Sequence, residues 1–162
     1  MDSMGGDGGH AVTIRAGRPD DGPAMGEVFT AARAAMTYLP QLHSAGEDRA
    51  FFAGVASVCA ADGCHLEVAE AGGALVGFVA VAADWLNHLY VHPEWQGRRI
   101  GAALLGRAQA ARPDGLQLWV FEANAGAQRL YARAGFEEVE RTDGRANIEK
   151  VPDVRMRWAG QR

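Results

Sequence analysis

A short glycine-containing turn between a predicted strand and a predicted helix is the feature of this sequence best suited to chemistry. The strand is expected over residues 85–91 and the helix from Gly101, with Gly97 in the turn between them. The first N–H groups of a helix lack acceptors within the helix, and the helix dipole places partial positive charge at the same end. Such a turn binds phosphate through its backbone. The sequence therefore predicts a phosphate-binding turn over residues 96–102.

Arginines near this turn and in a later helix can add charge to the same kind of site. Arg98 and Arg99 lie in the turn, and Arg129 and Arg133 lie four residues apart further along. The whole chain of 162 residues nevertheless has a formal net charge of −4. Proteins that bind nucleic acid usually present a basic surface, so the charge argues against such a partner. The arginines are interpreted as local anion sites, with a solvated helix face as the alternative for Arg129 and Arg133.

Tyr131 is the second candidate for chemistry, in a short helix predicted over residues 124–134. Asn is a good helix N-cap and glycine ends helices, so Asn124 and Gly135 are expected to bound this helix. Apolar residues recur at helical spacing on one face: Ala127, Leu130, Tyr131 and Ala134. A phenol can donate a proton, whereas the alternative role of Tyr131 is aromatic packing against Leu130.

The elements that must position these residues follow from apolar periodicity and turn residues. Strands are expected over residues 11–15, 65–70, 74–83, 85–91, 116–121, 136–141 and 153–158, and helices over 25–39, from 45 to the turn at 62–63, and over 101–112 and 124–134. The helix over 101–112 joins two strands in a crossover, so these strands should be parallel and the others antiparallel. The fold class is therefore predicted as α/β with a mixed sheet, in the order β-α-α-β-β-β-α-β-α-β-β, as one domain over residues 11–159.

Local signals add detail to this outline. Pro40 is expected to end the first helix, and Ser44 with Glu47 fits a capping box at the start of the second. Alternation along the strand over 85–91 places Trp85, Asn87, Leu89 and Val91 on one face and His88 on the other. The inward positions of the second helix are predicted to be Phe51, Phe52, Val55, Val58 and Cys59.

The two cysteines, Cys59 and Cys64, have no partner His or Cys at metal-ligand spacing, and two cysteines are too few for a disulfide scaffold. They are predicted to be reduced, partly buried thiols. No apolar run approaches the roughly 20 residues of a membrane span, so no membrane partner is expected. Residues 1–10 are rich in glycine and unlike a secretory signal, so they are interpreted as a flexible tail and the protein is expected in the cytoplasm.

Two segments resemble motifs of the GNAT superfamily of acetyl-CoA-dependent N-acetyltransferases. Residues 96–102 read Gln-Gly-Arg-Arg-Ile-Gly-Ala and resemble the Gln/Arg-x-x-Gly-x-Gly/Ala turn of that family. Residues 124–136 read Asn-Ala-Gly-Ala-Gln-Arg-Leu-Tyr-Ala-Arg-Ala-Gly-Phe and resemble its Asn-x-x-Ala-x-x-Leu-Tyr-x-x-x-Gly-Phe helix. Each motif alone is moderately specific, but the two in this order, one β-α-β unit apart, form a strong signal. The resemblance implies a GNAT-like fold with parallel fourth and fifth strands.

The resemblance implies acetyl-CoA as co-substrate, with no metal. Backbone N–H groups of the turn would hold its pyrophosphate, and Val91 would bond the pantetheine arm like an added strand. The alternative role of Leu89 and Val91 is sheet core, and that of Asn124 is simple capping. The cofactor-binding residues expected from the family are Leu89, Tyr90, Val91, Gln96, Gly97, Arg98, Arg99, Ile100, Gly101, Ala102, Asn124, Gln128, Tyr131 and Arg133.

Arg99 departs from the family pattern, since it stands where the turn usually has glycine. A Cβ at this position restricts φ, so the backbone is expected to take a less demanding conformation there. The side chain of Arg99 either adds charge near the phosphates or faces solvent.

The resemblance also implies roles in catalysis. The N–H of Leu89 would polarise the thioester carbonyl, as an oxyanion-hole donor does. Tyr131 would protonate the leaving thiolate, because a thiol has a pKa of about 8.5 and a phenol one of about 10. The attacking ammonium must lose a proton, yet the strand face that contains Leu89 offers only Asn87, which could orient a water. His88 points to the other face and is expected to be a packed or surface residue.

The acceptor side of the family's site lies between the first two helices and at the loop between the last two strands. By analogy Tyr38, His43 and Glu47 would bind the acceptor, although Glu47 also fits the capping box. His43, then Asp153 and Glu149, are the candidates for the general base. The acidic residues Glu47, Asp48, Glu149 and Asp153 hint at a cationic acceptor.

The function predicted from these residues is transfer of an acetyl group from acetyl-CoA to a primary amine of a small molecule or peptide. Attack is expected to be direct, in a ternary complex, because neither motif contains a cysteine nucleophile. One alternative is a non-catalytic acyl-CoA-binding module, and another is an enzyme that acetylates protein amines. A generic nucleotide-binding protein is disfavoured, since the turn lacks the P-loop ending and the dinucleotide glycine spacing. Dimers are frequent in the family, so a homodimer is compatible with the sequence.

Overall fold

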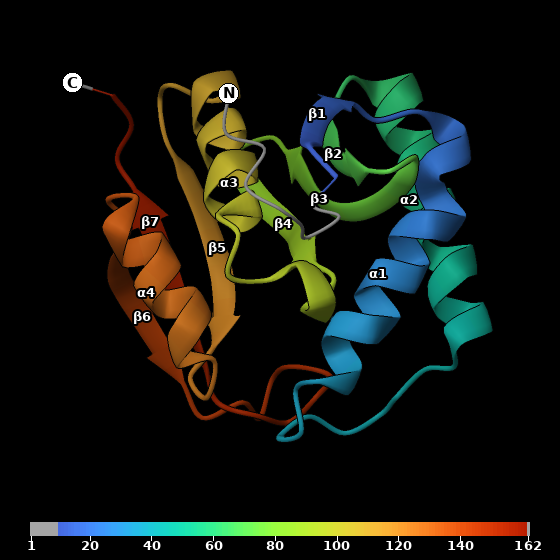
Figure 1. Cartoon of the computed structure of the whole chain (residues 1–162). Coiled ribbons are helices and arrows are strands. Elements are labelled where there is room, and N and C mark those ends of the chain that lie inside the picture. The colour runs from blue at the N-terminus through green and yellow to red at the C-terminus, as the bar shows by residue number, and fades with distance from the viewer. Residues whose placement is uncertain (1–9, 162) are drawn as a thin grey trace, which may run out of the picture.

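The computed structural model describes residues 10–161, which form a seven-stranded sheet with helices on both faces (Figure 1). The strands are β1 (Val12–Ala16), β2 (His65–Ala71), β3 (Ala74–Ala82), β4 (Trp85–Val91), β5 (Leu116–Phe121), β6 (Glu137–Thr142) and β7 (Asp153–Trp158). The helices are α1 (Gly22–Ala34), α2 (Ala45–Asp62), α3 (Ile100–Ala111) and α4 (Ala125–Arg133), with short 3-10 turns η1 (Pro19–Asp21) and η2 (Pro93–Trp95). The predicted fold class and element order are confirmed.

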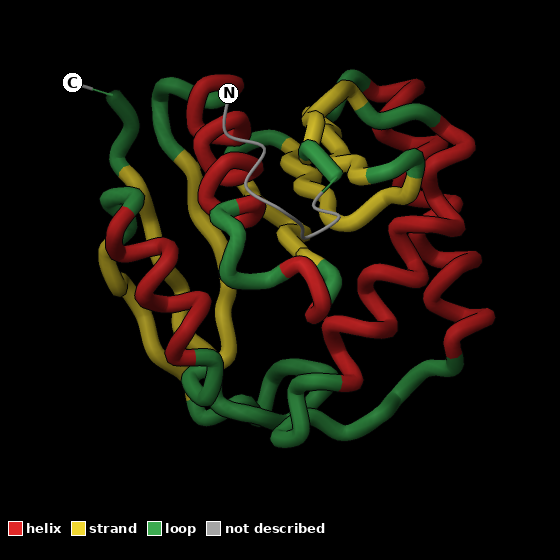
Figure 2. Tube along the Cα trace, viewed as in Figure 1, coloured by secondary structure: helices red, strands yellow, loops and turns green. Residues whose placement is uncertain are grey.

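The sheet has the strand order β1-β2-β3-β4-β5-β7-β6 and is antiparallel except between β4 and β5. In the described chain, the register of that parallel pair joins a single position, Trp85 opposite Gln117. Beyond it the two strands diverge, and Figure 2 shows the opening between them. The sheet is therefore split along its middle, on the side where β4 leads into the 96–102 turn.

Two cores pack on opposite faces of the sheet. One lies under α3 and α4 and contains fully buried Leu104, Leu105 and Leu118. The other lies under α1 and α2 and centres on Phe52 and Phe78, whose rings are 5.2 Å apart. Burial of these apolar faces holds the helices against the sheet, and so fixes the positions of their ends around the split.

Several helix details differ from the sequence-based expectation. The first helix ends at Ala34 rather than near Pro40, because the chain leaves the helix through successive turns at Met36 and Leu39. The capping box at Ser44 is present as predicted. Phe51 and Val58 on α2, expected to be buried, are 58% and 56% exposed, because they line an open groove between α2 and strands β3 and β4.

The alternation expected along β4 is interrupted at Asn87. The register passes from His88 opposite Ala80 to Leu86 opposite Val81, so Asn87 is an extra residue in β4, as in a β-bulge. The bulge turns Leu86 into the core under α3, while Asn87 itself is exposed. The prediction that Asn87 shares a face with Leu89 is therefore wrong.

The prediction of two free thiols is also wrong, because Cys59 and Cys64 form a disulfide. Gly63 ends α2 in the left-handed conformation, with φ of 69°. This turn reverses the chain at once into β2 and brings the two Cα atoms to 4.7 Å. A spacing of five residues thus closes a bond that sequence spacing alone did not suggest.

The predicted tail, residues 1–10, lies outside the described residues except for His10, which is exposed. Across residues 10–161, no helix has the length and apolar character needed to cross a membrane.

Candidate active site

A cleft of about 770 Å³ opens at the split between β4 and β5. It is bounded by the end of α1, the exposed edge of β4, the turn before α3, and α4 with the connection that precedes it. Its lining residues are Ala32, Ala35, Met36, Tyr38, Leu89, Tyr90, Val91, Trp95, Gln96, Gly97, Arg99, Ile100, Gly101, Ala102, Ala123, Asn124, Ala125, Gly126, Ala127, Leu130, Tyr131 and Arg133. Both sequence motifs therefore meet in one cavity, although they are separated along the chain.

The 96–102 turn has the open backbone geometry of an anion site. Gly97 has φ of 77°, and α3 begins at Ile100 with no side-chain hydrogen bond from its N-cap residue. By contrast, the side chain of Ser44 caps α2 and that of Asn124 caps α4. The first N–H groups of α3 are thus left for a group in the cleft, where the helix dipole favours negative charge.

Arg99 corrects an expectation about this turn. It is the N-cap residue of α3 and takes the left-handed conformation, with φ of 63° and ψ of 17°. The demanding backbone conformation of a glycine is therefore kept despite the Cβ, at a cost of about 1–2 kcal/mol. The side chain of Arg99 lines the cleft, whereas neighbouring Arg98 stacks on the ring of Trp95 at 4.5 Å and does not.

The edge of β4 directs backbone groups into the cleft. The N–H of His92 donates to the carbonyl of Val76 at 2.8 Å, so the even-numbered residues of this part of β4 pair with β3. The backbone groups of Leu89 and Val91 consequently point the other way, toward the gap left by β5. The side chain of Gln96 donates to the carbonyl of Val91 at 3.2 Å, which ties the 96–102 turn to this edge.

Tyr131 lies deep in the same cleft, on the wall formed by α4. Its side chain is 7% exposed and packs on the ring of Phe136 at 5.7 Å. Burial raises the pKa of Tyr131, and the nearby hydroxyl of Tyr90 adds to the increase. The phenol therefore stays protonated at neutral pH and is available as a donor to a group in the cleft.

Beyond Tyr131, an ion pair bridges α1 and the loop between β6 and β7. Arg33 Nη2 lies 3.1 Å from Glu149 Oε1, and both side chains are largely buried. The guanidinium also rests over the rings of Phe29 and Phe121, at 5.0 and 5.5 Å. Glu149, a candidate base in the sequence, is thus already engaged with a cation and anchors its loop.

Two phenols adjoin this ion pair. Burial raises the pKa of Tyr90, although the positive charge of Arg33 opposes the effect. Burial likewise raises the pKa of Tyr38, whose hydroxyl oxygen is buried and has no partner within residues 10–161. Both side chains line the cleft at its α1 end.

Several predicted site residues lie elsewhere. His43 and Glu47 are exposed, 3.3 Å apart, at the start of α2. Asp153 accepts hydrogen bonds from Thr142 and Asn147 within the β6–β7 connection. The remaining expected residues that do not line the cleft are Asn87, Arg98, Glu149 and Gln128, whose amide donates to the carbonyls of Phe121 and Glu122.

The acidic residues that hinted at a cationic acceptor are likewise occupied. Asp48 is buried and accepts a hydrogen bond from Thr30 at 2.7 Å, and Glu47 belongs to a capping box. Glu149 is paired with Arg33. The hint from composition is therefore not supported by where these side chains lie.

Sequence reasoning missed the contribution of the end of α1 and the turn after it, which supply Ala32, Ala35 and Met36 to the cleft, with Arg33 behind them. A weak signal was present, because Arg33 follows the apolar and small residues at the end of this helix. Missing as well were Trp95 and Leu130, whose side chains flank the turn.

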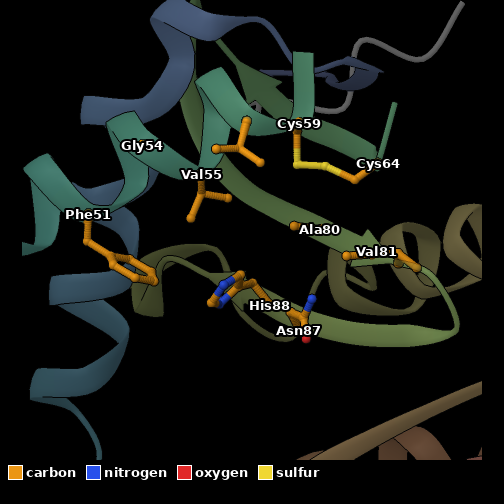
Figure 3. Close-up of a pocket in the computed structure, with 11 residues that line it drawn as sticks. Phe51, Gly54, Val55, Cys59, Cys64, Ala80, Val81, Asn87 and His88 are labelled. Atoms are coloured by element: carbon orange, nitrogen blue, oxygen red, sulfur yellow. A yellow bond between two sulfur atoms is a disulfide. The ribbon is translucent and has the colours of Figure 1, made fainter. Parts of the chain in front are cut away.

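A separate hollow, here called the α2 groove, lies on the other side of β4 (Figure 3). It measures about 420 Å³ and runs from Phe51 past His88 to the disulfide. Burial among aromatic rings lowers the pKa of His88 to about 4, so this imidazole is uncharged near neutral pH. The groove is almost wholly apolar and shares no lining residue with the cleft in the described chain. Chemistry is therefore assigned to the cleft.

Comparison with known proteins agrees with this geometry. Residues 62–138 match the family model of the acetyltransferase (GNAT) domain. The chain is 37% identical over 92 residues to an uncharacterized N-acetyltransferase of Methanocaldococcus jannaschii, MJ1207; the match covers 48% of this chain and 41% of that protein. The chain thus spans less than half the length of this relative.

Solved structures share the whole fold. The ribosomal-protein-S18-alanine N-acetyltransferase of Escherichia coli superposes with a TM-score of 0.71 at 20% identity, over 94% of this chain and 96% of that one. The PaiA N-acetyltransferase of Thermoplasma acidophilum, in complex with coenzyme A, gives 0.67 at 23% identity, over 92% and 99%. At these identities the likeness demonstrates a common fold.

Proposed function

We propose that this chain is a GNAT acetyltransferase and that it transfers an acetyl group from acetyl-CoA to a primary amine of a small molecule. Attack is direct, in a ternary complex. The observation that carries the proposal is that the uncapped start of α3, the free edge of β4 and Tyr131 all border one cleft.

The residues present fit a coenzyme A thioester. The N–H groups at the start of α3 suit a diphosphate, and Arg99 and Arg133 line the same cleft with positive charge. The backbone of Leu89 and Val91 suits an extended amide-containing arm, which pairs with a strand edge by β-augmentation. The thioester supplies an activated acetyl carbon and a good leaving group.

Two groups of the chain then act on the reacting atoms. The N–H of Leu89 donates to the thioester carbonyl oxygen as negative charge develops there. Tyr131, kept protonated by burial, donates to the sulfur as the C–S bond breaks. His43 and Asp153 are not retained as bases, because neither lines the cleft. Glu149 is retained as a positioning residue through its contact with Arg33.

The test measures binding and chemistry separately. Calorimetry with acetyl-CoA is expected to show binding that Gly97→Val weakens, and a thiol-release assay with an amine library is expected to show turnover. The matched control Gly106→Ala lies on α3 with open space around it and should leave binding unchanged. Tight binding with no thiol release across the library would favour the alternative, a non-catalytic acyl-CoA-binding module.

Acetylation of a peptide amine is the second candidate, and one observation favours it. The Escherichia coli enzyme with the same fold acts, by its name, on the alanine of a ribosomal protein. An alanine-ending peptide therefore belongs in the amine library. Its selective acetylation over small amines would replace the small-molecule acceptor proposed above.

A further inference from the structure

We propose that the acceptor is a weakly basic aromatic amine, whose nitrogen is uncharged near neutral pH. This inference rests on the proposed acetyl transfer and deepens it by naming the substrate class. Its basis is the α1 end of the cleft, where Ala32, Ala35, Met36, Tyr38 and Tyr90 surround the space next to Leu89 and Tyr131. Each of these side chains is apolar or phenolic.

An alkylammonium ion is poorly matched to this apolar and phenolic lining, here called the wall. It carries its charge at neutral pH because its pKa is about 10. Moving that charge from water into an apolar site without an anionic partner is costly. An aromatic amine has a delocalised lone pair and is a far weaker base, so it enters this space without charge.

The charges behind the wall act in the same direction. Arg33 lies against the rings of Phe29 and Phe121, and its positive charge opposes the rise in the pKa of Tyr90. Glu149 pairs with this guanidinium at 3.1 Å and is therefore engaged. From the other side of β4, His88 is uncharged near neutral pH and packs among aromatic rings. These groups offer a second cation no net attraction.

The lining at the α1 end of the cleft can also contact the aromatic ring of the acceptor. The rings of Tyr38 and Tyr90 and the thioether of Met36 line the same end of the cleft. Edge and face contacts between rings, and contacts of sulfur with rings, favour an aromatic guest over a flexible aliphatic chain.

The reaction balances without a base acting first. The lone pair of the amine forms a C–N bond to the acetyl carbon, the C–S bond breaks, and the electron pair of that bond leaves with sulfur. The nitrogen then loses one proton to water, the sulfur gains one from the Tyr131 hydroxyl, and the Tyr131 phenolate takes one back from water. The products are an N-aryl acetamide and the free thiol of coenzyme A.

The deciding experiment compares aniline with benzylamine, which differ by one methylene and in basicity. At pH 7 the value of kcat/KM for aniline is expected to exceed that for benzylamine by at least about tenfold, since most benzylamine is protonated. Between pH 6.5 and 8.5 the benzylamine rate should climb with pH, while the aniline rate stays level. Higher activity with benzylamine or a polyamine at pH 7 overturns the inference but leaves acetyl transfer intact. Failure of every amine overturns both.

A pair of variants tests the wall itself. Met36→Glu places a carboxylate in the α1 end of the cleft, and Met36→Gln has the same size without charge. Relative to Met36→Gln, Met36→Glu is expected to shift the ratio of benzylamine to aniline rates toward benzylamine by about tenfold. Equal ratios in the two variants refute the role of the uncharged wall. Acetyl-CoA calorimetry on both variants checks that each is folded.

Discussion

Glu149→Gln is expected to loosen the α1 side of the cleft without affecting the phosphate-binding turn. The side chains of Arg33 and Glu149 are 24% and 17% exposed. Breaking a buried ion pair costs about 3–5 kcal/mol, whereas an exposed one is worth about 0.2–1 kcal/mol. Intermediate burial places this variant at about 2 kcal/mol of lost stability. For a domain of this length that lowers Tm by roughly 4–8 °C.

A double-mutant cycle isolates the pair. Arg33→Met retains packing over Phe29 and Phe121 but removes the charge, and thermal unfolding of both single variants and the double variant gives the coupling free energy. We expect about 1–2 kcal/mol. The control is Asp143→Asn, because the Arg145–Asp143 pair is 92% and 64% exposed and should give no measurable change.

Kinetics complete this prediction. Because Glu149 anchors the β6–β7 loop against α1, its loss should raise KM for the amine and leave the Kd for acetyl-CoA unchanged. Additivity of the two single variants within about 0.3 kcal/mol would refute the ion pair as a stabilising contact. A weaker Kd for acetyl-CoA, with an unchanged KM for the amine, would show that the β6–β7 loop supports the acetyl-CoA side of the cleft and not the amine side.

Further predictions concern other parts of the molecule. Tyr131→Phe should lower kcat about tenfold or more with little change in acetyl-CoA affinity, and unchanged turnover would remove Tyr131 from the reaction. Gly97→Ala meets open space but a φ of 77°, so thermal unfolding should show a loss of about 1 kcal/mol that comes from the backbone alone. The folded pKa of His88, about 4, lies below its unfolded value of 6.5, so urea titrations should show stability falling as pH drops from about 6.5 toward 4, and His88→Phe should flatten that dependence. Reducing the Cys59–Cys64 disulfide opens a short loop and should lower stability by about 2 kcal/mol by calorimetry, whereas an unchanged Tm would show that the bond adds nothing.

The backbone of this fold was readable from the sequence because its signals are local. Apolar patterns and turn residues predicted all seven strands, and Ser44 and Asn124 marked helix starts that the structure confirms. The glycine turn and the Tyr131 helix were recognisable as motifs, so their meeting in one cleft followed from the β-α-β order.

The α1 end of the site was not readable in this way, because it depends on tertiary contacts. Arg33 meets Glu149 across 116 residues of sequence, and no local pattern reports such a pair. The bulge at Asn87 shifts the facing of β4 by one residue, which strict alternation cannot anticipate. The left-handed conformation of Arg99, shared by Ala83 and Lys150, shows that the fold tolerates a non-glycine residue at positive φ, which sequence patterns do not report.

The split between β4 and β5 has a mechanical consequence. Strands β1–β4 and strands β5–β7 form two hydrogen-bonded halves of the sheet. The two halves pair only at Trp85 and Gln117 in the described residues, so their junction has the fewest strand-pairing contacts in the sheet. By the function proposed above, acetyl-CoA bound along the gap would hydrogen-bond to the free edge of β4 and hold the two halves of the sheet together. At a hundred times its Kd it adds about 2.7 kcal/mol of stability by mass action. The concentration of acetyl-CoA would thus set the stability of the protein as well as its rate of reaction.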